Sequence, residues 1–408
     1  MAEEEKKPKP IYLFPDLLEE ILLRLPLQSI LNFKIVAKQW RSILESRRFA
    51  ERRVEIQKNR KILAAVDHEP ESRFEGDEEI EVFYLHCDCD DVATRPSLTC
   101  DGLVCIPVPG WVNVLNLSTG ESIGFPSGPD PVTNYYDYQL ASGYWWNTFP
   151  AFWAMGFGKD IVNGSYKVVR MFFDPNHYCE ILDVNIGEWR KLLNPPPYKV
   201  DARRKSACVN GSIYWLELHD KLCVLALDLH TEVFRVIPSP PICSESDQVV
   251  NLENRLAIAK TNTWSDWKLE IRCLDAQEKT WSMTYTISLT SIATPRPWRV
   301  WFRPMAVSKQ GNLFFYDSKK RLFKYYPETS SLRCLSLDIC VISPFVENLV
   351  SLRPSGSYVP KTSGSRPSGF PSIDSRISKI FRQIPNILLT TTLVSLVVFR
   401  YFVVSSKS

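Results

Sequence analysis

Residues 11–54 read IYLFPDLLEEILLRLPLQSILNFKIVAKQWRSILESRRFAERRV. Pro15 and Asp16 favour the start of a helix, because proline presets φ and an acidic side chain suits the positive end of a helix. Leucines and isoleucines then recur at helical spacing as far as Leu25, which gives this helix one wide apolar face. Pro26 cannot continue the pattern, so we expect the helix to end there.

Two more short helices are expected in this stretch. Ser29 can cap a helix over residues 30–36, and a further helix should run over residues 38–44 around Trp40. Three helices of this length cannot bury so many large apolar side chains by themselves. The apolar surface that the helices cannot bury predicts a face that docks on another protein. The alternative is a helical hairpin that belongs to a larger core.

The positions that define this pattern keep a regular order along the chain. They are Phe14-Pro15-Asp16-Leu17-Leu18, Ile21-Leu22, Leu25-Pro26, Ser29-Ile30, Phe33-Lys34, Val36, Lys38, Trp40-Arg41-Ser42-Ile43 and Phe49. This order resembles the F-box, the module by which receptor subunits of ubiquitin ligases dock on the SKP adaptor of a cullin–RING complex. Phe14 stands where that family usually has Leu, and Ala37 where it usually has Cys or Ser.

The resemblance implies a small all-α F-box of three helices over residues 11–54. It also implies that the SKP-type adaptor, and through it the cullin and RING subunits, are partners of this chain. The adaptor-binding residues would be Pro15, Leu17, Leu18, Ile21, Leu22, Leu25, Pro26, Ile30 and Trp40.

The composition favours a protein of two or more domains. The chain has 408 residues, of which 45% are hydrophobic, enough for a sizeable core. Its formal charge of +3 is close to balance, and no basic stretch with interleaved aromatic residues indicates a nucleic-acid partner. Residues 1–10 are charged and proline-rich, which predicts disorder and argues against a secretory signal. The odd count of 11 scattered cysteines then favours reduced thiols in the cytosol or nucleus.

The sequence offers no constellation for catalysis or for a cofactor. His86, Cys87 and Cys89 form the one local group of metal-ligand residue types, and no second pair stands at the spacing that zinc sites need. The run from Gly156 to Asp160 faintly matches a phosphate loop, but the first glycine and the Ser or Thr after the lysine are missing. We therefore expect no metal, no cofactor and no enzymatic activity.

Residues 55–352 consist of short β-rich runs bounded by Gly, Asn, Asp and Pro, which is typical of an all-β domain. Turns that contain glycine precede strands at residues 101–102, 210–211 and 310–311. A second, polar kind of turn recurs with steps of 67, 45, 47 and 52 residues, at Asn116, Asp183, Asp228, Asp275 and Pro327. Repeats of about 45–50 residues predict four-stranded blades, and about six of them form a propeller. The Trp or Phe after such a turn is expected to pack between blades.

Further motifs of this region occur in a fixed order. They are Cys100-Asp101-Gly102-Leu103-Val104-Cys105, Val114-Leu115-Asn116-Leu117-Ser118-Thr119-Gly120, Met155-Gly156-Phe157-Gly158, Ser165-Tyr166-Lys167-Val168-Val169-Arg170, Val209-Asn210-Gly211-Ser212-Ile213-Tyr214-Trp215-Leu216 and Val346-Glu347-Asn348-Leu349-Val350-Ser351-Leu352. Their order resembles the plant F-box-associated domain, a kelch-like propeller that follows the F-box. The resemblance implies that residues 55–352 form this propeller.

The first two polar turns, at Asn116 and Asp183, are 67 residues apart, which is long enough for an insertion. This insertion, residues 126–152, is unusually rich in aromatic residues. Aromatic side chains on exposed loops concentrate binding energy, so this insertion is a candidate for binding a target protein. The alternative is that many of these side chains are core residues between blades. The candidate substrate-binding residues are Tyr135, Tyr136, Tyr138, Tyr144, Trp145, Trp146 and, in a later loop, Trp298.

The C-terminal part of the chain changes character twice. Residues 353–382 are rich in Pro, Ser and Gly in their first part, which predicts a flexible linker. Residues 383–404 contain an apolar run with Arg400 as its one charge, near the lower limit of length for a membrane-spanning helix. Arg376, Lys379 and Arg382 precede it, so its N-terminal side would face the cytosol. We expect a C-terminal apolar helix that acts as a tail anchor. The alternative is a disordered or partner-covered tail.

Together the two resemblances imply a receptor subunit of an SCF-type ubiquitin ligase, with the adaptor on the F-box and a target protein on the propeller. Such a subunit needs no catalytic residue, because it supplies proximity to chemistry on another subunit. The protein would face the cytosol, on an intracellular membrane or, without a working anchor, in the soluble cytoplasm or nucleus. The competing readings are a membrane-tethered propeller scaffold without a ligase role and a kelch-type enzyme, which would need a metal or cofactor site.

Overall fold

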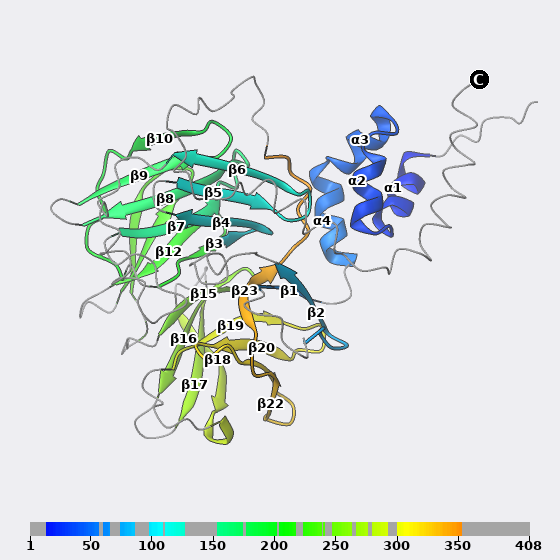
Figure 1. The fold of residues 1–408 in the computed structure, drawn as a ribbon. Coiled ribbons are helices and arrows are strands. Elements are labelled where there is room, and N and C mark those ends of the chain that lie inside the picture. The colour runs from blue at the N-terminus through cyan, green and yellow to red at the C-terminus, as the bar shows by residue number, and fades with distance from the viewer. Residues whose placement is uncertain are drawn as a thin grey trace, which may run out of the picture. The chain divides into compact units, whose positions relative to one another are not determined.

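The computed structural model describes residues 14–56, 60–65, 74–85, 98–108, 111–126, 153–173, 177–201, 204–217, 223–238, 240, 247–262, 267–275, 280–292 and 300–352. The chain divides into two compact units, with the boundary between Gln57 and Lys58. The first unit is helical and the second consists of β-sheets (Figure 1). The expected N-terminal disorder, the linker and the C-terminal apolar helix all lie outside the described residues. Among the described helices, none is long and apolar enough to cross a bilayer.

The described part of the helical unit contains four helices, so the expectation of three is wrong. They are α1 (Pro15–Leu23), α2 (Leu27–Phe33), α3 (Lys38–Leu44) and α4 (Arg47–Ile56). Pro15 begins α1 as expected. Ser29 does not cap α2: the extended Pro26 occupies the cap position, and Ser29 lies inside the helix.

The additional helix α4 begins where Ser46 accepts a hydrogen bond from the backbone N–H of Phe49 at 3.2 Å, an N-cap contact. Arg53 of α4 donates to the carbonyl oxygens of Leu23 at 3.2 Å and Leu25 at 2.9 Å, at the end of α1. These carbonyls have no intrahelical donor, so a buried guanidinium stabilises them. The helix α4 therefore completes the core of the helical unit.

The second unit contains five sheets of four antiparallel strands, each built from consecutive strands of the chain. They are β3 (Leu98–Cys100), β4 (Leu103–Val108), β5 (Trp111–Asn116) and β6 (Glu121–Pro126); β7 (Trp153–Lys159), β8 (Tyr166–Phe172), β9 (Tyr178–Asp183) and β10 (Glu188–Lys191); β11 (Ala207–Val209), β12 (Ser212–Leu216), β13 (Cys223–Asp228) and β14 (Phe234–Pro238); β15 (Gln248–Leu252), β16 (Arg255–Asn262), β17 (Lys268–Leu274) and β18 (Trp281–Ser288); and β19 (Phe302–Val307), β20 (Leu313–Asp317), β21 (Leu322–Tyr326) and β22 (Ser331–Ser336). A short 3₁₀ helix, Thr290–Ile292, follows β18.

The sixth sheet combines both ends of the unit, in the order β2 (Ile80–Leu85), β1 (Arg60–Ala65) and β23 (Cys340–Phe345). The strand β23 pairs antiparallel with β1, whereas β1 pairs parallel with β2. The first strands of successive four-stranded sheets contact one another, and β19 contacts β23. The unit is therefore a six-bladed propeller with the first strands at its centre, as the repeat spacing predicts.

Residues 346–352, which we call the closing segment, continue from β23 along the sheet of β3–β6. Asn116 donates through Nδ2 to the carbonyl oxygens of Asn348 at 3.0 Å and Val350 at 2.7 Å. The backbone N–H of Leu352 donates to Glu121 at 2.8 Å. The closing segment thus links the sixth sheet to the next one in the ring, and it does so mainly through backbone groups, which are strong and obligatory hydrogen-bonding partners.

The two kinds of turn that recur in the sequence have distinct structural positions. The glycine turns join first and second strands. The φ angles of Asp101 and Gly102 are 47° and 78°, and those of Asn210 and Gly211 are 46° and 77°. Two successive positive φ values characterise the type I′ turn that suits a two-residue hairpin.

The polar turns join third and fourth strands. In three of them an Asn or Asp side chain accepts a hydrogen bond from the backbone N–H two or three residues later, which stabilises the turn. The bonds join Asn116 to Ser118 at 2.9 Å, Asp183 to Asn185 at 2.9 Å, and Asp228 to Thr231 at 2.8 Å.

Tryptophans at the start of fourth strands join neighbouring blades, as the sequence predicts. Trp189 of β10 donates through Nε1 to the carbonyl oxygen of Pro126, at the end of β6. Trp281 of β18 makes the same bond to Pro238, at the end of β14. The distances are 2.8 and 2.7 Å. The indole therefore satisfies the last carbonyl of the preceding blade while its ring covers the gap between blades.

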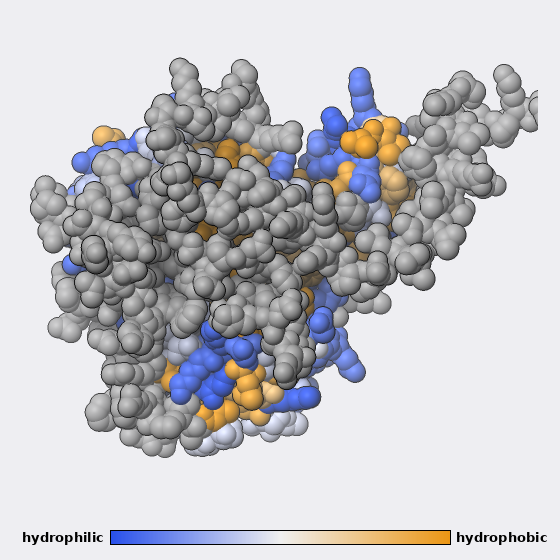
Figure 2. All heavy atoms as spheres, in the orientation of Figure 1, coloured by the Kyte–Doolittle hydropathy of each residue, from blue (hydrophilic) through white to orange (hydrophobic). Residues whose placement is uncertain are grey.

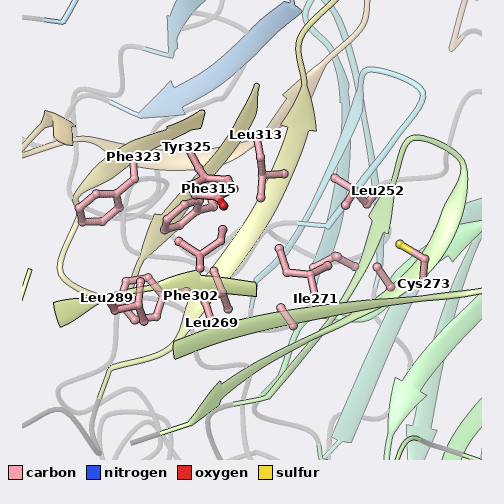
Figure 3. Packing of buried hydrophobic residues seen from close by; sticks show 14 of the residues in the cluster. Leu252, Leu269, Ile271, Cys273, Leu289, Phe302, Leu313, Phe315, Phe323 and Tyr325 are labelled. Carbon is pink, nitrogen blue, oxygen red and sulfur yellow. The ribbon is translucent and has the colours of Figure 1, made fainter. Parts of the chain in front are cut away.

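Large apolar side chains fill the space between sheets. Figure 3 shows the cluster formed by the sheets of β15–β18 and β19–β22. Phe302, Phe315 and Phe323 lie together there, with ring centroids 5.2 to 6.1 Å apart. Interior packing of this kind holds each blade against the next, because a single four-stranded sheet cannot bury both faces alone.

Candidate functional site

The predicted adaptor-binding residues separate into three groups by exposure. Leu18, Leu22 and Ile30 are 3%, 0% and 0% exposed and form the core of the helical unit. Leu25 and Trp40 are half-buried, and Trp40 packs edge-on against Phe33 with ring centroids 5.0 Å apart. The exposed members are Pro15, Leu17, Ile21 and Pro26.

The exposed apolar residues of α1 form one continuous strip. Leu17 and Ile21 are 52% and 40% exposed and lie four residues apart, so their side chains are neighbours on the helix surface. Phe14, immediately before the helix, is 71% exposed and precedes Leu17 by three residues. We call Phe14, Leu17 and Ile21 the α1 surface. In the view of Figure 2, hydrophobic side chains of the helical unit reach the surface beside charged ones.

A second group of exposed apolar residues follows α2. Ile35 and Val36 are 81% and 40% exposed. Sequence reasoning included Val36 in the motif but missed Ile35, although a β-branched pair at a helix end was visible in the sequence. Isolated exposed apolar residues are ordinary in soluble proteins, but five within 23 residues are a concentration that makes this part of the helical unit a candidate interaction surface.

Ion pairs between α1 and α4 hold the α1 surface in place. Arg52 donates to Glu19 at 2.7 Å and also pairs with Glu20, on the side of α1 away from the strip. Arg48 lies 3.5 Å from Glu19. Because α4 binds the polar side of α1, no helix among the described residues of this unit covers the apolar side of α1.

The predicted substrate-binding residues of the propeller, from Tyr135 to Trp146 and Trp298, lie outside the described residues. The insertion that carries the tyrosines joins the end of β6 to the start of β7. The later loop, with Trp298, leads to the start of β19. Both loops are therefore attached at the end of the propeller where first strands begin.

The faint phosphate loop at Gly156 to Asp160 is not a loop. Gly156 and Gly158 lie within the strand β7. A Cβ atom on Gly156 would lie 2.5 Å from Trp215, and Trp215 donates through Nε1 to the carbonyl oxygen of Met155 at 2.8 Å. The glycine therefore allows the neighbouring blade to approach, which is a packing role.

Among the residues that the structure describes, no group of three or more His, Cys, Asp or Glu could hold a metal ion. The cluster of His86, Cys87 and Cys89 is outside the described ranges. The closest thiols that the structure places are Cys100 and Cys208, with sulfur atoms 4.0 Å apart between β3 and β11. Two thiols alone do not make a zinc site.

Comparison with known proteins agrees with this architecture. The model of the F-box domain matches residues 12–52, and that of the F-box associated beta propeller domain matches residues 55–338. The F-box/LRR-repeat protein At2g43260 of Arabidopsis thaliana is 50% identical over 409 residues, covering 94% of this chain and 94% of that protein. The F-box/kelch-repeat protein At2g43445 of the same plant is 48% identical over 422 residues, covering 97% and 98%.

These similarities extend over both units and through the closing segment, so they concern the whole architecture and not a single motif. The chain therefore belongs to the plant F-box proteins that carry a C-terminal F-box-associated β-propeller domain.

Proposed function

We propose that this chain is the substrate-recruiting receptor subunit of an SCF-type ubiquitin ligase. The α1 surface binds the SKP-type adaptor, and the propeller binds a target protein. The exposed apolar strip of Phe14, Leu17 and Ile21 within the F-box carries this proposal, because apolar surface of this density on one small unit is stable in water mainly when a partner covers it.

The mechanism is proximity. The adaptor, the cullin and the RING subunit bring a ubiquitin-loaded conjugating enzyme close to the target, whose lysines then react at a raised effective concentration. This chain contributes binding and geometry. Leu18, Leu22 and Ile30 act in this scheme through the fold, because they hold α1 in the position at which its exposed side chains meet the adaptor.

The test compares the wild type with a Leu17→Asp, Ile21→Asp double variant in plant cells. Proteins bound to the propeller should be recovered with both. Ubiquitin-modified peptides from those proteins should depend on the wild type, and their half-lives should lengthen several-fold with the variant. Equal ubiquitin modification of the bound proteins in the two cases would contradict a receptor role.

We also propose that residues 383–404 anchor the protein to a membrane, on the strength of the apolar run and the basic residues before it. Deletion from Ile384 onward should move the protein from the pelleted membrane fraction to the soluble fraction. Deletion of residues 405–408 alone, which keeps the apolar run, should leave it in the pellet. An unchanged distribution after the longer deletion rejects the anchor.

A further inference from the structure

Three lysines of the propeller have almost no solvent exposure: Lys167, Lys205 and Lys324. A buried ammonium group is costly unless an opposite charge compensates it. For two of them, a pair of carboxylates does so. Lys167 lies 3.1 Å from Asp160 and 3.4 Å from Glu232, and Lys324 lies 3.0 Å from Asp77 and 2.8 Å from Glu79.

Lys205 is the exception among the described lysines of this burial. It is 8% exposed, and the only hydrogen bond of its Nζ to a described residue is to the carbonyl oxygen of Ile342, at 3.5 Å. No carboxylate of the described residues pairs with it. The nearby Asp201 is engaged by the Nε of Arg204 at 2.8 Å.

The position of Lys205 places its ammonium group near the axis of the ring. Lys205 precedes β11, whereas Ile342 lies in β23, and the first strands β15 and β19 come between these two around the propeller. The contact therefore crosses the centre, at the end where first strands begin. Gln248 begins β15 at the same end, and Arg303 is the second residue of β19.

A second cation, Arg303, acts on Lys205 through its charge. Arg303 donates through Nη1 to Gln248 at 3.1 Å and has no carboxylate partner among the described residues. Its side chain is half-buried. Among the described groups, Tyr316 acts on Arg303 and Cys340 acts on Lys205. Burial raises the pKa of Tyr316, so its hydroxyl is neutral at physiological pH. Asp247, which is buried and next to Gln248 in the chain, accepts a hydrogen bond from Arg204 through its backbone carbonyl oxygen.

The electrostatic consequence differs between the buried lysines. Burial alone lowers the pKa of Lys324, but hydrogen bonds to Glu79 and Asp77 raise it above its usual value. Burial and the charge of Arg303 instead lower the pKa of Lys205 to about 7. Burial also lowers the pKa of Arg303.

We propose that Lys205 and Arg303 form a binding site for an anionic group, a carboxylate, phosphate or sulfate, at the centre of the propeller. The two like charges repel each other, no carboxylate of the described residues neutralises them, and a bound anion would gain charge-assisted hydrogen bonds from both. The anion is either an acidic or phosphorylated side chain of the recruited protein, in which case this inference rests on the proposed function, or a small free anion.

The experiment titrates sodium sulfate into the purified full chain, against sodium chloride at equal ionic strength, and measures heat of binding and thermal unfolding. Sulfate stabilises folded proteins in general, so the readout is the difference between variants. The wild type should show saturable binding with one site, and Lys205→Met should lose it. Lys309→Met, the same change at an exposed lysine, should behave as the wild type.

The pH dependence follows from the charge of Lys205. With a pKa of about 7, the free lysine is roughly ten times more often charged at pH 6 than at pH 8. Sulfate is doubly charged at both pH values, so its affinity should be about tenfold higher at pH 6. If Lys205→Met does not fold, Arg303→Gln provides the same comparison. Equal sulfate binding by wild type and variant overturns the proposal.

Two further measurements separate the sources of the anion. Lys205→Met should release the propeller-bound proteins if they carry the anionic group, and should keep them if the group is a free anion. Retention of the SKP-type adaptor is scored in the same samples. If the wild type does not bind the adaptor, the proposed function is rejected. The comparison of sulfate binding between wild type and variants remains valid in that case, because it does not involve the adaptor.

Discussion

Replacing Leu17 and Ile21 together by Asp should abolish binding of a purified SKP-type adaptor while the thermal unfolding of the propeller stays unchanged. The two side chains are exposed in the chain alone, so the substitution does not disturb its core. At an interface each carboxylate would be buried without a partner, which costs about 2 kcal/mol or more. Two such groups weaken binding by a factor of about 1,000, since 1.4 kcal/mol corresponds to a factor of ten. Titration calorimetry with the purified adaptor measures this loss.

The matched control is Leu193→Asp. Leu193 is 100% exposed and belongs to the propeller unit, so the same chemical change should leave adaptor binding unaltered. The pair Leu18→Asp and Leu22→Asp is a poor test of docking, because both residues are buried and the helical unit would unfold. Wild-type affinity in the Leu17→Asp, Ile21→Asp variant would show that the adaptor binds elsewhere.

The contrast between Leu17 and Leu18 shows where sequence reasoning about the F-box ended. The apolar stripe of α1 is too wide to face only the core or only a partner. The helical spacing of its residues does not show which of them are buried and which are exposed. That choice depends on α4, which covers one side of α1 through Arg52 and Arg53. The helix α4 was missed because its sequence, RRFAERRVEI, is dominated by charge and has few apolar positions. Its cap, Ser46, was a usable signal.

In the propeller, the local features were predictable and the distant pairings were not. Each polar turn depends on one Asn or Asp side chain and its own neighbours, so the repeat was visible in the sequence. The pairing of β1 with β23 joins residues about 280 positions apart, such as Lys61 and Phe345, and no local pattern encodes it. The parallel pairing of β1 with β2 joins residues only 20 positions apart, such as Arg60 and Ile80, but it also has no local turn to signal it. Lys205 was missed for a related reason. A lysine after two arginines is ordinary in a loop, and only the fold shows that no carboxylate of the described residues pairs with it.

Substituting Gly102 by Ala should destabilise the propeller strongly, because this glycine lies under the closing segment. A Cβ atom at position 102 would lie 1.8 Å from the carbonyl oxygen of Val346. That oxygen belongs to the backbone, so no rotamer change relieves the overlap and the closing segment must move. Its movement breaks the hydrogen bonds from Asn348 to the carbonyl oxygen of Asp101 at 2.8 Å and to the hydroxyl of Tyr166 at 2.9 Å. We expect a loss of about 4 kcal/mol in the free energy of unfolding, measured by urea denaturation.

Two other glycines isolate the effect of the closing segment from that of backbone strain. Gly164 and Gly311 have φ angles of +79° and +85°, close to the +78° of Gly102, but an added Cβ would meet nothing within 4 Å. Alanine at either position therefore costs about 1 kcal/mol, the strain of a positive φ. The excess for Gly102→Ala is the contribution of ring closure, and Asn348→Ala should add little to it, because both changes disrupt the same contact. If Gly102→Ala is no more destabilising than Gly164→Ala, the closing segment does not hold the ring as described.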